Sequence, residues 1–69
     1  MQEITLELKL EIARMQSELN KYEKKYNLRT KEFYLQFEKG KLNDGKDFMI
    51  WSGIYELQMD SKNKLNEII

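Results

Sequence analysis

Residues 44–57 read DGKDFMIWSGIYEL, and the fold depends on this stretch. It contains the only tryptophan of the 69-residue chain, Trp51, and one of the three phenylalanines, Phe48. Because an enclosed Trp or Phe side chain buries roughly 150–250 Å², a chain of this length needs both residues at the centre of its core. Phe48, Trp51 and Tyr55 are spaced by three and four residues, which places them on one face of a helix. We expect the same helix to present Ile54 and Leu57.

Polar residues mark the starts of two predicted helices. Asp44 is predicted to cap a helix over residues 45–67. Asp47, in the first turn of that helix, is expected to interact favourably with its dipole. Thr30 is predicted to cap a short helix over residues 31–39, which carries Phe33, Tyr34 and Phe37 on its inner side.

A further helix, over residues 9–26, is predicted from an apolar stripe. Asn27 tolerates the left-handed backbone conformation that ends many helices, and Gly40 is expected to end the short second helix in the same way. Leu42 is predicted to pack back into the core. The stripe repeats at steps of four and three residues, and it consists of Leu8, Ile12, Met15, Leu19, Tyr22 and Tyr26.

Residues 3–8 leave two alternatives open. Ile4, Leu6 and Leu8 alternate with polar residues, as in a half-buried strand. The segment is nevertheless rich in Leu and Glu, whose helix propensity is high. Either the first helix begins early, which propensity favours, or the segment is an intermolecular β-strand that pairs with a second copy or with a partner's sheet. We expect an intermolecular contact in both cases.

These elements predict an all-α fold, a small three-helix arrangement in one domain over residues 1–69. The two long helices are expected to pack antiparallel, and the short one to cross them. The structural core is predicted to consist of Ile12, Met15, Leu19, Tyr22, Phe33, Phe37, Leu42, Phe48, Trp51 and Tyr55.

Composition argues against most catalytic chemistry. The chain has no Cys and no His, and its formal net charge is zero, so thiolate and imidazole nucleophiles, bases and metal ligands are missing. The loop 43–47 carries oxygen-bearing side chains but does not match the EF-hand spacing. We predict a protein that is not an enzyme and uses no cofactor or metal. No long apolar run or leader is present, which predicts a cytoplasmic protein without a membrane span.

More apolar side chains are present than a three-helix monomer encloses easily, so an interface with another chain is expected. Gly53 costs roughly 0.5–1 kcal/mol in a helix interior. Close approach of the first helix or of another subunit would offset that cost, with a kink as the second interpretation. The chain is predicted to form a homo-oligomer, with a dimer as the first choice. The predicted interface consists of Ile4, Leu6, Leu10, Gly53, Met59 and Leu65.

A homodimeric DNA-binding regulator is the alternative function. Residues 21–46 carry eight basic and four acidic residues, and Tyr22 and Tyr26 lie among the lysines. Such a cluster can contact phosphates. The same tyrosines also continue the core stripe, with the lysines as its solvated flank, so nucleic acid is not the favoured partner.

A longer pattern comprises the run Tyr26-Asn27-Leu28-Arg29-Thr30-Lys31-Glu32-Phe33, then Phe37, Gly40-Lys41-Leu42, Asp44, Asp47-Phe48, Trp51 and Tyr55. This pattern resembles that of a group of short bacterial and archaeal helical proteins, frequent in cyanobacteria, that look like antitoxin components encoded next to a small toxin-like protein. The resemblance covers residues 22–57 and implies a helical fold and a protein partner that the chain binds and neutralises. Gly53 and Asn43 stand where we would expect Ala and Gly.

Overall fold

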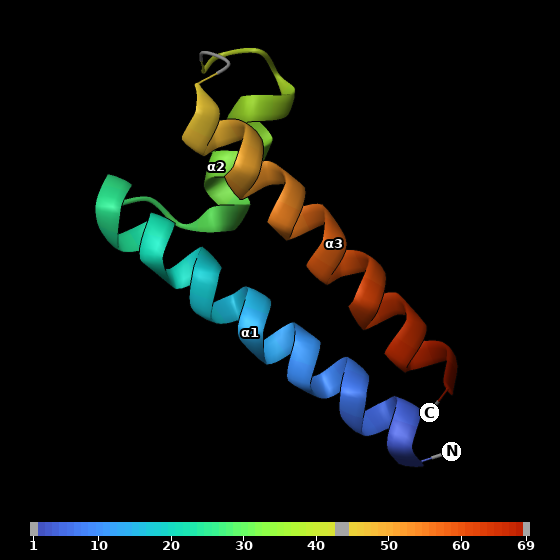
Figure 1. Ribbon diagram of the computed structural model, residues 1–69. Helices are drawn as coiled ribbons and strands as arrows, with labels where there is room; N and C mark the ends of the chain where they lie inside the picture. Colours follow the sequence, from blue (N-terminus) through green and yellow to red (C-terminus); the bar gives the residue numbers. More distant parts are fainter. Residues whose placement is uncertain (1, 43–44, 69) are drawn as a thin grey trace.

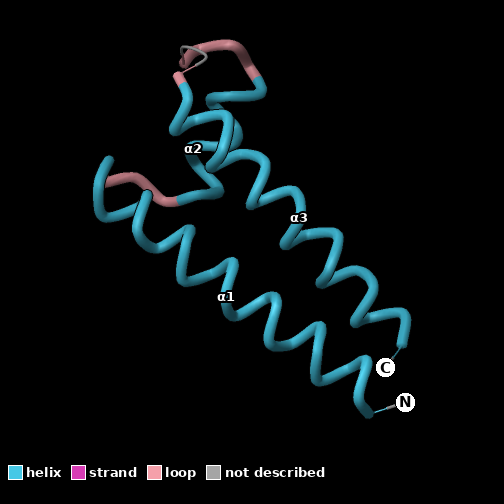
Figure 2. Tube along the Cα trace, in the orientation of Figure 1, coloured by secondary structure: helices cyan, strands magenta, loops and turns pink. Residues whose placement is uncertain are grey.

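The computed structural model describes residues 2–42 and 45–68 and contains three helices in that part of the chain: α1 (Gln2–Tyr26), α2 (Thr30–Glu38) and α3 (Lys46–Ile68). α1 and α3 form an antiparallel hairpin, and α2 lies across one end of it (Figure 1). The two ends of the chain lie at the other end. Figure 2 shows helices joined by loops, with no strand among the described residues. The predicted all-α, three-helix fold is confirmed.

Residues 3–8 belong to α1, which begins at Gln2. Of the two alternatives for this segment, the structure therefore has the early helix. Thr5 and Leu8 are half-buried on the side of α1 that faces α3, whereas Leu6 is 58% exposed. The alternating pattern thus arises from two different sides of one helix.

The two left-handed helix ends are confirmed. Asn27 has a φ of 51° and Gly40 a φ of 71°. After Gly40, the N–H of Lys41 donates to the carbonyl of Gln36 at 3.0 Å, while the N–H of Gly40 donates to Phe37 at 3.1 Å. This pair of bonds is the Schellman arrangement, which satisfies carbonyls that a helix end would otherwise leave unpaired.

The predicted capping role of Thr30 is wrong. α2 begins at Thr30 itself, preceded by Arg29, which makes no side-chain capping bond. The backbone N–H of Thr30 donates instead to the Glu23 carboxylate at 2.8 Å, so a side chain of α1 caps α2. The Thr30 hydroxyl has a different role, because it accepts a hydrogen bond from the buried indole N–H of Trp51 at 2.9 Å.

At the start of α3, Asp44 lies outside the described residues, so its predicted capping role is not assessed by the structure. The carbonyl of Gly45 accepts the Met49 N–H at 3.0 Å, as the residue before a helix does. Asp47 lies in the first turn of α3, as expected. Its carboxylate also bonds to α1, as described below.

The core is an aromatic cluster at the end of the hairpin that α2 covers. Leu19, Phe33 and Trp51 are buried, one from each helix. The rings of Phe33 and Trp51 lie 3.8 Å apart and nearly parallel, at 3°. Ile12 and Met15, predicted as core, are half-buried and lie outside this cluster. Partly buried residues packed against it are Tyr22, Leu28, Tyr34, Phe37, Leu42, Phe48, Ile54 and Tyr55.

The rest of the molecule is only two helices deep. We call residues 4–15 of α1 and 57–68 of α3 the open half, and the end that holds α2 the closed half (Figure 1). The molecule measures 41 × 21 × 17 Å, with a radius of gyration of 13.3 Å. A compact domain of this length would have about 11 Å. The elongation leaves the open half without a third layer.

Candidate protein-interaction surface

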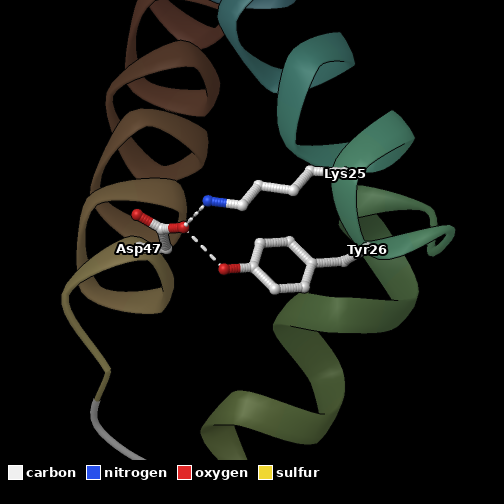
Figure 3. Close-up of polar contacts among 3 residues, drawn as sticks. All are labelled: Lys25, Tyr26 and Asp47. Carbon is white, nitrogen blue, oxygen red and sulfur yellow. Dashed lines mark hydrogen bonds and ion pairs between the residues drawn. The ribbon is translucent and has the colours of Figure 1, made fainter.

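The closed end carries a polar clasp between the end of α1 and the start of α3 (Figure 3). One carboxylate oxygen of Asp47 accepts hydrogen bonds from Lys25 Nζ at 2.6 Å and from the Tyr26 hydroxyl at 2.5 Å. The hydrogen bond from Lys25, with that from Tyr26, lowers the pKa of Asp47. The Asp47 carboxylate raises the pKa of both Lys25 and Tyr26. The clasp therefore joins α1 to α3 at this end of the hairpin. The negative charge of Asp47 is balanced by the positive charge of Lys25.

A second polar contact joins α2 to α3. The Tyr34 hydroxyl donates to the Glu56 carboxylate at 2.6 Å. The hydrogen bond to Glu56, followed by that to Glu38, raises the pKa of Tyr34 well above the ordinary phenol value. The ring of Tyr34 also packs against Tyr55, with centroids 4.9 Å apart. This contact fixes α2 on one flank of α3.

Gln58 is the largest of the buried polar side chains that the sequence interpretation missed, which also include Ser52 and Ser61. It is 1% exposed, and its amide nitrogen donates to the Ile12 carbonyl at 3.2 Å and to the Gln16 side chain at 3.0 Å. Its position three residues after Tyr55 continues the stripe of Phe48, Trp51 and Tyr55, so spacing alone could have indicated burial. The contact sets the register of α3 against α1.

The predicted interface residues on α1 are exposed, but they do not share one surface. Leu6 and Leu10 are 58% and 49% exposed. Each is two residues from Leu8, and residues two apart point to nearly opposite sides of a helix. Leu6 and Leu10 therefore lie on the face of α1 that is turned away from α3, whereas Ile4, 49% exposed, lies near the seam between the two helices.

The predicted interface residues of α3 are also divided between surfaces. Met59 is 45% exposed and Leu65 is half-buried. Leu57, expected on the inner face, is 62% exposed, so that expectation is wrong. Leu57 lies two residues after Tyr55, which packs on the core cluster, so its side chain points away from that cluster.

The expected approach of α1 to Gly53 is also wrong. A Cβ atom built at Gly53 would meet no atom within 4 Å. Gly53 instead lies one turn before Leu57, which borders a shallow groove of about 260 Å³ between α1 and α3. The other residues that line the groove are Glu11, Arg14, Met15 and Ser61.

Two other predictions concern charged residues. Among residues 2–42 and 45–68, no group of three or more acidic side chains is placed to hold a metal ion. Two lysines of the basic middle region are already paired, Lys25 with Asp47 at 2.6 Å and Lys21 with Glu18 at 3.2 Å. These ion pairs reduce the free positive charge that a phosphate backbone would meet.

In the described part of the chain, no helix combines the length and apolarity needed to cross a membrane.

Comparison with known proteins gives no match: no family model, no curated protein and no solved structure is similar to this chain.

Proposed function

We propose that the protein is a non-enzymatic interaction module, antitoxin-like, that binds and neutralises a cognate protein. The observation that supports this function is the open half, where two helices alone carry large apolar side chains that no third layer covers. Exposed apolar side chains that lie side by side, as Leu6 and Leu10 do, commonly mark a binding site. The chain would act in the cytoplasm, as an oligomer. The exposed apolar residues of the open half are Ile4, Leu6, Leu10, Leu57, Met59 and Ile68.

The partner is expected to dock on the far face of α1. Leu6 and Leu10 lie one turn apart on that face and offer two anchors that an apolar groove can take, as amphipathic helices commonly do. Leu10 lines a shallow hollow with Glu7, Glu11 and Arg14. The complementary surface is therefore an apolar groove whose rim carries charged side chains of both signs.

The test is co-expression with the product of the neighbouring gene, the kind of partner that the resemblance implies. We expect the two chains to purify together and the pair to permit cell growth that the neighbour alone prevents. Leu6→Arg combined with Leu10→Arg should abolish both effects, because two charges would enter the groove. The parent and the double variant should have the same helicity by circular dichroism, since the two leucines are 58% and 49% exposed.

The matched control is Leu35→Arg, since Leu35 is 53% exposed but lies on α2. This variant should bind and protect as the parent does. The proposal fails if the neighbouring product does not bind the parent chain. It also fails if the double variant binds as tightly as the parent.

A further inference from the structure

We propose that α3 contains a hinge at Ser52–Gly53, about which its outer segment, residues 54–68, swings away from α1 while the closed half stays folded. Hydrogen bonds from the Gln58 amide to α1 hold the outer segment in its closed position. The inference goes beyond the proposed function, because it concerns a movement within one chain and requires no cognate protein.

Gly53 supplies the backbone freedom for this hinge. The chain has three glycines and no proline, and Gly53 is the glycine that lies inside a helix. A glycine in a helix interior weakens the helix there, because it gains more backbone freedom than other residues when the helix opens. Outside its own stretch of helix, no atom of the described chain lies within 4 Å of a Cβ built at Gly53, so close packing does not explain the glycine. In helices without proline, sharp bends commonly occur at a Gly/Ser pair of this kind.

The hydroxyl of Ser52 lowers the cost of a bend. It donates to the Met49 carbonyl at 3.0 Å. In an α-helix the same carbonyl accepts the N–H of the residue four positions later, which is Gly53. The Met49 carbonyl therefore keeps a donor when the Gly53 N–H leaves it, and serine bonds to the preceding turn often bend helices. The Gly53 N–H, which has no side chain to shield it, then becomes accessible to water.

The hinge separates two parts of α3 that pack differently. Before it, Trp51 belongs to the buried cluster and donates a hydrogen bond to Thr30. After it lies the open half, in which no apolar side chain of the described residues is fully buried. α1 has no glycine and is the straight helix alongside which the outer segment lies in the closed position (Figure 1). The outer segment can therefore move while the aromatic cluster stays intact.

The Gln58 amide holds the outer segment against α1. Its nitrogen donates to the Ile12 carbonyl at 3.2 Å and to the Gln16 side-chain oxygen at 3.0 Å. Both acceptors stay satisfied when Gln58 leaves, because the Ile12 carbonyl keeps the helical N–H of Gln16 and the exposed Gln16 side chain meets water. The contact can therefore break without leaving a buried polar group unpaired.

The movement changes the surface that α1 offers. In the closed position Leu8, Ile12 and Met15 are half-buried. When the outer segment swings away, these side chains become exposed in addition to Leu6 and Leu10, and this part of α1 is then apolar on two faces. The hinge thus controls how much apolar surface α1 presents.

Distances between two spin labels measure the movement. The natural chain has no Cys, so introduced cysteines take the labels at defined positions. Glu7→Cys with Asn66→Cys labels the open half, and Lys24→Cys with Met49→Cys labels the closed half; all four residues are exposed. By pulsed electron paramagnetic resonance we expect one distance for the closed-half pair and an additional, longer distance for the open-half pair. A single open-half distance in both the parent and Gln58→Ala overturns the proposal.

Three substitutions test the contact and the hinge. Gln58→Ala should raise the share of the longer distance about fivefold or more, because two hydrogen bonds are lost. Gly53→Ala, added to Gln58→Ala, should lower that share about two- to fivefold, since alanine favours the straight helix and its Cβ meets no neighbouring atom. Ser52→Ala in the same background should act in the same direction. An unchanged share in both combined variants contradicts a hinge at Ser52–Gly53.

The matched control is Asn63→Ala, also in the Gln58→Ala background. Asn63 is exposed on the outer segment, and its replacement raises helix propensity by a comparable amount but lies beyond the hinge. The share of the longer distance should stay unchanged. If Asn63→Ala lowers it as much as Gly53→Ala does, the end of α3 frays and the hinge is wrong. A longer closed-half distance in Gln58→Ala would mean that the whole hairpin opens, which also contradicts the proposal.

Discussion

The hydroxyl of Thr30 is the acceptor for the indole N–H of Trp51, and both groups are buried. A buried donor without a partner costs about 1–3 kcal/mol. In the described part of the chain, no buried side-chain nitrogen or oxygen lacks a hydrogen bond. This single contact therefore links the first residue of α2 to the centre of the aromatic cluster.

Thr30→Val should destabilise the protein by about 1–3 kcal/mol, because it keeps the shape of the side chain and removes the acceptor. Thr30→Ser retains the hydroxyl and should cost less. Urea unfolding followed by Trp51 fluorescence measures both variants. If Thr30→Val and Thr30→Ser unfold at the same urea concentration, the hydrogen bond does not stabilise the core.

Thr30 also shows what spacing and residue type do not determine. Threonine before a short helix is a good N-cap by type, and nothing local indicates that a tryptophan 21 residues later needs its hydroxyl. Glu23, which caps α2 in its place, lies on a different helix. Interactions between distant residues of this kind depend on the packing of the helices, which residue order alone does not specify.

At the scale of elements, helix ends were predictable because they depend on local backbone chemistry. Asn27 and Gly40 adopt the left-handed conformation that their residue types permit at low cost. The inner face of α3 was predicted only in part. Leu57 is exposed and Gln58 is buried, since position on the helix outweighs polarity once the Gln58 amide finds partners.

α2 is held to α3 partly by the Tyr34 hydroxyl, and this contact is sensitive to alkali. The carboxylates of Glu56 and Glu38 raise the pKa of Tyr34 above 10.0. Since the folded pKa exceeds the unfolded one, the stabilisation is complete below about pH 10 and is lost as the pH rises through the folded pKa. The parent should therefore lose stability above pH 10 more steeply than Tyr34→Phe, which carries no ionisable group there.

Urea midpoints at pH 8 and pH 11 measure this difference. Lysine deprotonation affects the parent and Tyr34→Phe alike, so the comparison isolates the phenol. If the urea midpoint falls equally in the two proteins between pH 8 and pH 11, the Tyr34 hydroxyl does not stabilise the attachment of α2.

At the scale of the whole molecule, stability is unevenly distributed. The buried cluster lies in the closed half, whereas the open half relies on a two-helix seam with Gln58 and Ser61 among its buried residues. Regions with few buried apolar contacts open at lower free energy than the core. Amides of residues 4–12 should exchange with deuterium at least about tenfold faster than those of residues 33–37, a difference of about 1.4 kcal/mol.

Hydrogen exchange followed by mass spectrometry of the parent chain measures this difference. Uniform protection along the hairpin would contradict an uneven distribution of stability.

The two ends of the chain lie at the same end of the hairpin (Figure 1), which determines how the molecule responds to mechanical force. A pull between the termini acts on α1 and α3 at right angles to their seam, so the helices separate one turn at a time, beginning at the open half. Tension reaches the stacked rings of Phe33 and Trp51 last. The force needed should therefore be low at first and rise abruptly when only the aromatic cluster remains.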